Sequence, residues 1–147
     1  MGRGKAAFFS VICLAAVFGW GALAQVPDPS ARQLAQHLAS GERPLTDTGF
    51  MRAAGPFAGA LSAHGVARVP ITLRAGQDYR VFGVCDAACG GIGLRLYDAG
   101  ATTVAETTGA SPLIAARPQR TGQFLLEIDM GRCAQPPCYY AVNIYSR

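Results

Sequence analysis

Apolar and polar residues alternate with a period of two through most of this chain from Phe57 onwards. This pattern predicts strands that bury one face, and it limits the fold more than any other feature. Eight short runs of it are separated by turn-forming segments such as Asp98-Ala99-Gly100 and Thr121-Gly122, with no helical pattern between them. A parallel sheet needs helical crossovers, so residues 57–147 are predicted to form an all-β, antiparallel β-sandwich of about eight strands.

The segment before this alternation, residues 25–56, has a different pattern. Asp28 and Pro29 are typical of a helix start, with Asp28 as the N-cap residue, and leucines follow at helical spacing. Gly41 is expected to end this short N-terminal helix. From Glu42 to Pro56, glycines and prolines predict an irregular crossing or a flexible tether.

The N-terminus, residues 1–24, predicts a secretory signal peptide. Arg3 and Lys5 precede a long apolar run, and small residues end it at Ala22 and Ala24, so cleavage is expected before Gln25. The alternative is a retained anchor, since the run is just long enough to span a bilayer. The small residues favour cleavage, which predicts Sec-type export to the periplasm or full secretion, with no stable membrane anchor.

The charge of the exported chain is small. Of the 13 Lys and Arg residues, Arg3 and Lys5 lie in the predicted signal, whereas all 9 Asp and Glu residues follow it. The exported chain would carry a net charge of about +2, all of its cations being arginine, which is too weak to indicate a nucleic-acid partner.

Four cysteines follow the predicted signal: Cys85, Cys89, Cys133 and Cys138. An even number in an exported chain indicates two disulfides, for which three pairings are possible. We favour the two local pairs, because glycines follow the first and prolines lie inside the second, and both let the chain turn back. A four-cysteine zinc site is the alternative, but its usual spacing differs and the export route is oxidising.

Three motifs occur in order: Leu73-Arg-Ala-Gly76-Gln-Asp-Tyr79, Leu94-Arg-Leu-Tyr-Asp-Ala-Gly100 and Gly122-Gln-Phe-Leu-Leu-Glu-Ile128. Together they resemble the bacterial pre-peptidase C-terminal domain over about residues 57–146. The resemblance implies a jelly-roll type of β-sandwich that serves as a non-catalytic accessory or binding module of exported enzymes. Some members carry acidic residues before the second motif, which suggests a cation site. Here glycines stand there, and only Asp86 and Asp98 remain as weak Ca²⁺ candidates.

No set of residues in the sequence indicates catalysis. His37 and His64 fall in different predicted elements, and Ser111 precedes a proline in a predicted turn. Glu127 and Asp129 share one face of a predicted strand and are expected to form a solvated surface rather than a glycosidase pair. We therefore expect no enzymatic activity, no cofactor and no metal.

Arginines and tyrosines on predicted strands form a candidate ligand face: Arg68, Arg74, Arg80, Arg95, Tyr97, Tyr139 and Tyr145. If the arginines align, they form a basic stripe suited to an anionic glycan, lipid headgroups or an acidic partner. Tyr139 and Tyr145 have the strand parity opposite to inward-facing residues, so they could present rings to a sugar or peptide. The alternative is an ordinary solvated face with tyrosines at sandwich edges.

These observations favour an exported, monomeric, non-catalytic binding module that acts on a cell-envelope protein or glycan. One alternative is a small secreted enzyme or protease inhibitor that uses the loops around Asp86 and Ser111. The other is a structural envelope protein that associates with its own copies through exposed strands.

Overall fold

The computed structural model describes residues 26–147, so the predicted signal peptide and its cleavage site at Ala24 and Gln25 lie outside the described residues. The described elements are α1 (Asp28–Asp47), β1 (Met51–Leu61), β2 (Val66–Leu73), β3 (Tyr79–Cys85), β4 (Ile92–Tyr97), β5 (Thr103–Gly109), β6 (Leu113–Ala116), β7 (Gly122–Met130) and β8 (Cys138–Ser146). Within residues 26–147, no helix has the length and apolar character needed to cross a membrane.

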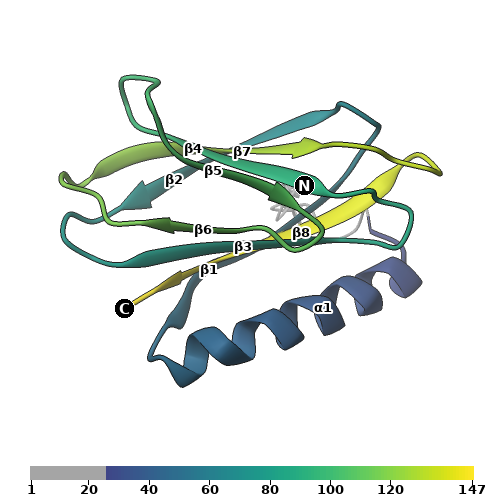
Figure 1. Ribbon diagram of the computed structural model, residues 1–147, viewed down its shortest axis with the longest axis horizontal. Helices are drawn as coiled ribbons and strands as arrows, with labels where there is room; N and C mark the ends of the chain where they lie inside the picture. The colour runs from purple at the N-terminus through teal and green to yellow at the C-terminus, as the bar shows by residue number, and fades with distance from the viewer. Residues whose placement is uncertain (1–25) are drawn as a thin grey trace, which may run out of the picture.

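The eight strands form two antiparallel sheets that pack face to face. The first sheet has the order β1-β8-β3-β6 and the second has the order β2-β7-β4-β5. Strand β1 pairs with β8, β2 with β7, β3 with β6, and β4 with β5. A folded ribbon of this kind, wrapped into two sheets, is a jelly roll. The predicted all-β sandwich of jelly-roll type is therefore confirmed, with α1 forming a third layer on the first sheet (Figure 1).

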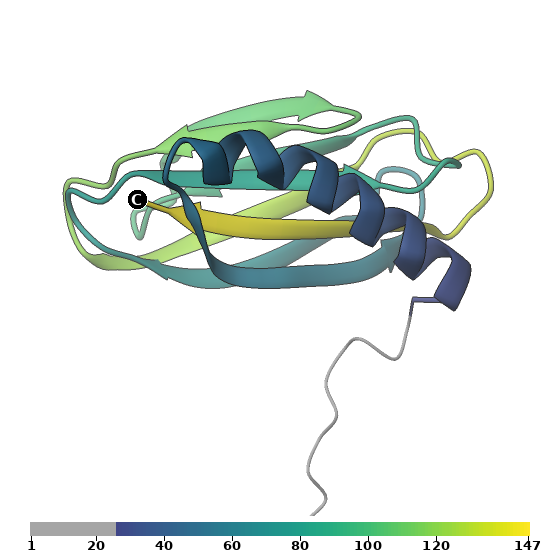
Figure 2. The ribbon, with the colours of Figure 1, turned by 90° about the horizontal axis from the view of Figure 1, so that it is seen from below.

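Two apolar cores hold these layers together. The larger core lies between the sheets, where alternate residues of the central strands, such as Leu94, Leu126 and Val142, are fully buried. The smaller core lies between α1 and the first sheet and includes Leu34 and Leu38. Helix α1 runs obliquely across that sheet (Figure 2) and covers the outer face of its two central strands, β8 and β3.

Helix α1 is longer than predicted, and Gly41 does not end it. The helix continues through Gly41 and Pro44 to Asp47, and Pro27 rather than Asp28 is its N-cap residue. Gly41 lies against β3, where a Cβ atom would overlap the ring of Phe82. The glycine is therefore needed for the close approach of the helix to the sheet, which the sequence pattern alone does not distinguish from a helix stop.

The prediction of an irregular segment from Glu42 to Pro56 is also wrong. It contains the end of α1 and the start of β1, so the sandwich begins at Met51 rather than at Phe57. Strand β1 is at the edge of its sheet, and its register with β8 shifts on both sides of Ala54. An edge strand with such bulges accommodates a Gly-Pro pair, which a central strand would not.

Two buried tyrosines predict a loss of stability at high pH. Burial raises the pKa of Tyr140 and Tyr145 above the ordinary value of 10.0. Because the folded pKa exceeds the unfolded one, this contribution to stability is complete below about pH 10 and is lost as the pH rises through the folded pKa. We expect the free energy of unfolding, measured with urea, to fall above that pH and to fall less in Tyr140→Phe. An equal decline in the two proteins would contradict this account.

Candidate functional site

The structure does not bring the seven predicted ligand-face residues together. Arg68, Arg95 and Tyr97 lie on the second sheet, whereas Arg80, Tyr139 and Tyr145 lie on the first, and Arg74 follows β2 in a turn. No continuous basic stripe forms across these residues. The sequence pattern gives the inward-facing residues of β2, β3, β4, β7 and β8 correctly, but it does not assign strands to sheets.

On the outer face of the second sheet, four charged residues stand side by side in one row. The strand register places Arg68 opposite Glu127, Glu127 opposite Arg95, and Arg95 opposite Glu106. The ion pairs measure 2.8 Å for Arg68–Glu127, 3.3 Å for Arg95–Glu127 and 2.7 Å for Arg95–Glu106. Hydrogen bonds to Tyr97 and Glu106 raise the pKa of Arg95.

This charge row buries Glu127 and pairs both of its arginines. Glu127, predicted to be solvated, is only 7% exposed because the neighbouring arginines and Tyr97 enclose it. Each arginine of the row faces a carboxylate, so the face has little free positive charge with which to attract an anion. The paired charges of the row are therefore suited to stabilising this face of the sheet rather than to binding a ligand.

The remaining predicted ligand-face residues of the first sheet are engaged in packing. Tyr145 is fully buried in the core beneath α1, and Tyr139 packs against the same cluster. The guanidinium of Arg80 lies 4.7 Å from the ring centre of Phe50. The helix therefore covers a surface that strand parity alone predicts to be free.

The two weak Ca²⁺ candidates are far apart. Asp86 precedes β4 and Asp98 follows it, so they lie at opposite ends of that strand. Asp98 Oδ1 accepts hydrogen bonds from the backbone N–H groups of Gly100 and Thr102, as in a turn. Residues 26–147 contain no cluster of three or more potential metal-ligating side chains. The geometry does not support a shared cation site for the two carboxylates.

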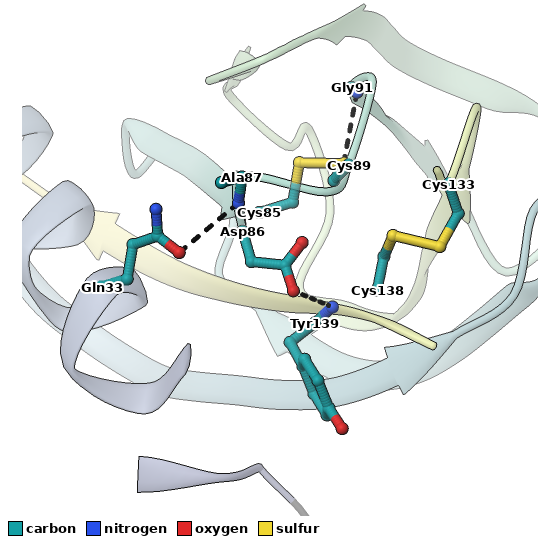
Figure 3. The surroundings of a disulfide bond; sticks show 9 residues. All are labelled: Gln33, Cys85, Asp86, Ala87, Cys89, Gly91, Cys133, Cys138 and Tyr139. Carbon is teal, nitrogen blue, oxygen red and sulfur yellow. Dashed lines mark hydrogen bonds between the residues drawn. A yellow bond between two sulfur atoms is a disulfide. The ribbon is translucent and has the colours of Figure 1, made fainter. Parts of the chain in front are cut away.

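One end of the sandwich is held by both disulfides, and we call it the cysteine end. It comprises the loops at residues 62–65, 86–91, 110–112 and 131–137, which join strands at the same end of the two sheets. Cys85 pairs with Cys89 and Cys133 with Cys138, with Cα–Cα distances of 5.9 and 5.8 Å (Figure 3). The predicted local pairing is confirmed.

Backbone hydrogen bonds join two of these loops directly. The N–H of Gly90 donates to the carbonyl of Arg132 at 2.7 Å, and that of Ala134 donates to Ala88 at 2.8 Å. Cys89 and Cys133, one from each disulfide, form an isolated antiparallel bridge between them. The two loops therefore behave as a single short ladder, closed by a disulfide on each side.

The base of the cysteine end is also attached to the helix and to β8. The backbone N–H of Ala87 donates to Gln33 Oε1 of α1, and that of Tyr139 donates to Asp86 Oδ2 at 3.1 Å (Figure 3). Among the described residues, the buried Oδ1 of Asp86 has no hydrogen-bond partner. These contacts fix the loop between β3 and β4 to α1 and β8. The side chain of Asp86 therefore supports the loop and does not project from its surface.

The surface of the cysteine end is a shallow hollow of about 560 Å³ lined mostly by alanine, glycine and cysteine. Its exposed ionisable side chains are His64 and Arg132. A Cβ atom on Gly90 would lie 2.9 Å from the Cβ of Arg132, so the glycine leaves room for the arginine stem. The exposed guanidinium of Arg132 is suited to binding an anionic group of a partner.

The second disulfide is expected to contribute measurably to stability. Replacing Cys133 and Cys138 together with alanine should lower the free energy of unfolding by about 2 kcal/mol, because the cross-link closes a short loop. Urea unfolding followed by circular dichroism measures this difference. Treatment of both proteins with a reducing agent provides the control, and an unchanged unfolding midpoint in the variant would contradict the expectation.

These features define a class of structure: a jelly-roll β-sandwich with one helix-covered face and one disulfide-held end. The fold is similar to that of Aeromonas hydrophila PliG, a periplasmic lysozyme inhibitor of g-type lysozyme, with a TM-score of 0.51 and 12% sequence identity. The match covers 63% of this chain and 85% of PliG. At this identity the similarity concerns the fold alone. No family model and no curated protein matches the sequence, so the resemblance to the pre-peptidase C-terminal domain stays a prediction.

Proposed function

We propose that this chain is an exported, non-catalytic binding module that inhibits a glycoside hydrolase acting on cell-wall glycans. In this proposal the cysteine end enters the active-site cleft of the enzyme. The observation that carries it is the ladder between the loops at 86–91 and 131–137, closed by two disulfides. The proposal favours the inhibitor alternative over a general accessory module.

A rigid loop surface is the main physical requirement of such an inhibitor. Binding a flexible loop costs conformational entropy, and this cost is removed when the loop already has its bound shape. In the cysteine end, the hydrogen bonds at Gly90 and Ala134 and the disulfides fix the backbone before any partner arrives. Hydrolase clefts are concave, so the loops that border the shallow hollow of the cysteine end are the part that would enter one.

The charge at this end suggests which kind of cleft it fits. Most glycoside hydrolases carry two carboxylates on either side of the bond that they cleave. A guanidinium matches a carboxylate in shape and charge, and Arg132 is exposed at the cysteine end. The charge row on the second sheet offers no such free cation, since its arginines are paired.

The similarity to PliG supports the choice of enzyme class. PliG is described as a periplasmic inhibitor of g-type lysozyme, and the match extends over most of its length. The predicted signal peptide and the two disulfides agree with an oxidising, exported location such as the periplasm. Because Arg132 also suits a cleft that carries carboxylates, lysozymes are the first enzymes to test.

The test is inhibition of lysozymes by the intact protein purified from the periplasm. A suspension of peptidoglycan clears as lysozyme cuts it, and we expect the protein to stop clearing by at least one lysozyme at near-stoichiometric concentration. Lysozymes of several structural types, including the g-type, are assayed one at a time, and a panel of secreted proteases is assayed separately for comparison. Inhibition of a protease alone, or sedimentation with peptidoglycan without any inhibition, would overturn the proposal.

A further inference from the structure

A second concave surface lies at the end of the sandwich opposite the cysteine end. It is an open groove of about 720 Å³ between β5 and β6, which are edge strands of different sheets. Small or apolar residues form part of its lining, namely Val104, Ala115, Ala116 and Phe124, and polar residues of the turn between β6 and β7 form the rest. This mixture is typical of a binding site rather than of a packing defect.

The turn that borders the groove is held in place by its neighbour. The N–H of Gly76 donates to the carbonyl of Pro118 at 2.8 Å, and that of Ala75 donates to Thr121 Oγ1 at 2.9 Å. Both bonds join the turn at residues 117–121 to the one after β2. The backbone that carries Arg117 and Arg120 is therefore fixed relative to the groove.

Two positive charges on this turn have no negative partner. In the described part of the chain, no carboxylate lies within salt-bridge distance of Arg117 or Arg120, and both residues are exposed. Asp98 also lines the groove and keeps its negative charge, while its Oδ1 accepts the N–H groups of Gly100 and Thr102. Two arginines against one carboxylate leave the groove with a positive balance, which favours an anionic ligand.

The groove also exposes an unpaired strand edge. Strand β6 pairs with β3 on one side, and no strand pairs with its other edge, which approaches β5 of the second sheet and borders the groove at Ala115 and Ala116. Ala115 and Ala116, which line the groove, have side chains too small to hide the backbone behind them. On the facing strand, Val104 is the extra residue of a bulge between β4 and β5, and it is 46% exposed. An extended chain could therefore add to β6 with apolar contact on the opposite side.

We propose that this groove binds an extended acidic segment of a partner polypeptide, which pairs with the free edge of β6 and places carboxylates against Arg117 and Arg120. A polypeptide is favoured over an anionic glycan because only a polypeptide supplies repeating N–H and C=O groups that can pair with the backbone groups of the strand edge. This surface lies at the end opposite Arg132, so the proposal is independent of lysozyme inhibition.

The test uses a fluorescein-labelled peptide of alternating glutamate and valine residues and measures its affinity by fluorescence anisotropy. We expect Arg117→Ala/Arg120→Ala to weaken binding at least about tenfold, through the loss of two charge-assisted contacts. The matched control is Arg32→Ala/Arg43→Ala, which removes two exposed arginines of α1 and should leave the affinity unchanged. A peptide with N-methyl groups on alternate residues tests the strand pairing and should bind much more weakly.

Several results would overturn the proposal. They are an absence of peptide binding at millimolar concentration, equal binding of a peptide with lysine in place of glutamate, and equal binding by the Arg117/Arg120 variant. Binding of oligogalacturonate but not of the acidic peptide would indicate an anionic glycan site instead. Because Arg117 and Arg120 are distant from the cysteine end, the same variant should inhibit lysozyme normally, so each proposal can fail without the other.

Discussion

Replacing Arg132 with glutamate is expected to raise the inhibition constant for the target lysozyme by at least about 100-fold, or roughly 2.7 kcal/mol. The proposed complex buries this side chain opposite carboxylates of the enzyme cleft. The substitution would remove an attractive charge and add a repulsive one at the same place. The inhibition constant is measured from the rate of peptidoglycan clearing at increasing concentrations of each protein.

Two variants show whether the effect belongs to this position. Arg132→Lys keeps the charge but loses the planar, two-pronged geometry, so we expect an intermediate inhibition constant. Arg120→Glu makes the same charge change at the opposite end and should leave inhibition unchanged. Circular dichroism and thermal unfolding establish that each variant is folded. A folded Arg132→Glu protein that inhibits as well as the original would exclude Arg132 from the binding surface.

Replacing Gly41 with leucine is expected to lower the free energy of unfolding by roughly 3 kcal/mol. Even a Cβ atom at this position overlaps the ring of Phe82, so a leucine requires either the buried ring or α1 itself to move. The movement would expose part of the small core around Leu34 and Leu38. The cost exceeds the gain of up to about 1 kcal/mol that leucine makes over glycine within a helix.

The matched control for Gly41→Leu is Ala39→Leu, which adds the same side chain to an exposed position of the same helix. We expect that variant to change stability by less than about 0.5 kcal/mol. In the background of Phe82→Ala, the cost of Gly41→Leu should become much smaller, because the ring that it meets is gone. Equal costs with and without the ring would show that the helix does not depend on this contact.

The β-sandwich itself could be predicted from the sequence because its signal is local. Every strand of the second sheet buries one face, and alternate residues record it directly, whereas β3 and β8 also bury their other face beneath α1. The disulfide pairing was predictable for the same reason, since each cysteine pair closes a short loop next to turn-forming residues. The jelly-roll order needed the family resemblance, because period-two patterns do not state which strands are neighbours.

The errors come from residues whose role depends on distant parts of the chain. A glycine such as Gly41 is typical of a helix end, but here it lies inside a helix. The reason is the ring of Phe82 on β3, which leaves no room for a side chain at this position. Tyr145 has outward strand parity, but α1 covers it. Glu127 has the pattern of a solvated residue, but Arg68 and Arg95 from two other strands enclose it. In each case the deciding contact joins segments that the sequence separates.

The candidate site was only partly predictable. The sequence indicates the loops around Asp86 and Ser111 as the two that an inhibitor could use, and both loops form part of the cysteine end. The ladder from the loop around Asp86 to the loop at 131–137 depends on strands β3 and β8 being adjacent in one sheet. The bridge between Cys89 and Cys133 that places Arg132 at this surface cannot be seen in the sequence. The only sequence signal for Arg132 is its position directly before Cys133, a cysteine predicted to form a disulfide.

Amide hydrogen exchange of this protein with and without a g-type lysozyme both detects binding and locates the binding surface. We expect slower exchange in the complex at the loops of residues 86–91 and 131–137, with little change at residues 98–102 and 117–121. Unchanged exchange everywhere with this and the other lysozymes of the panel, or protection confined to the end that carries Arg117 and Arg120, would contradict inhibition through the cysteine end.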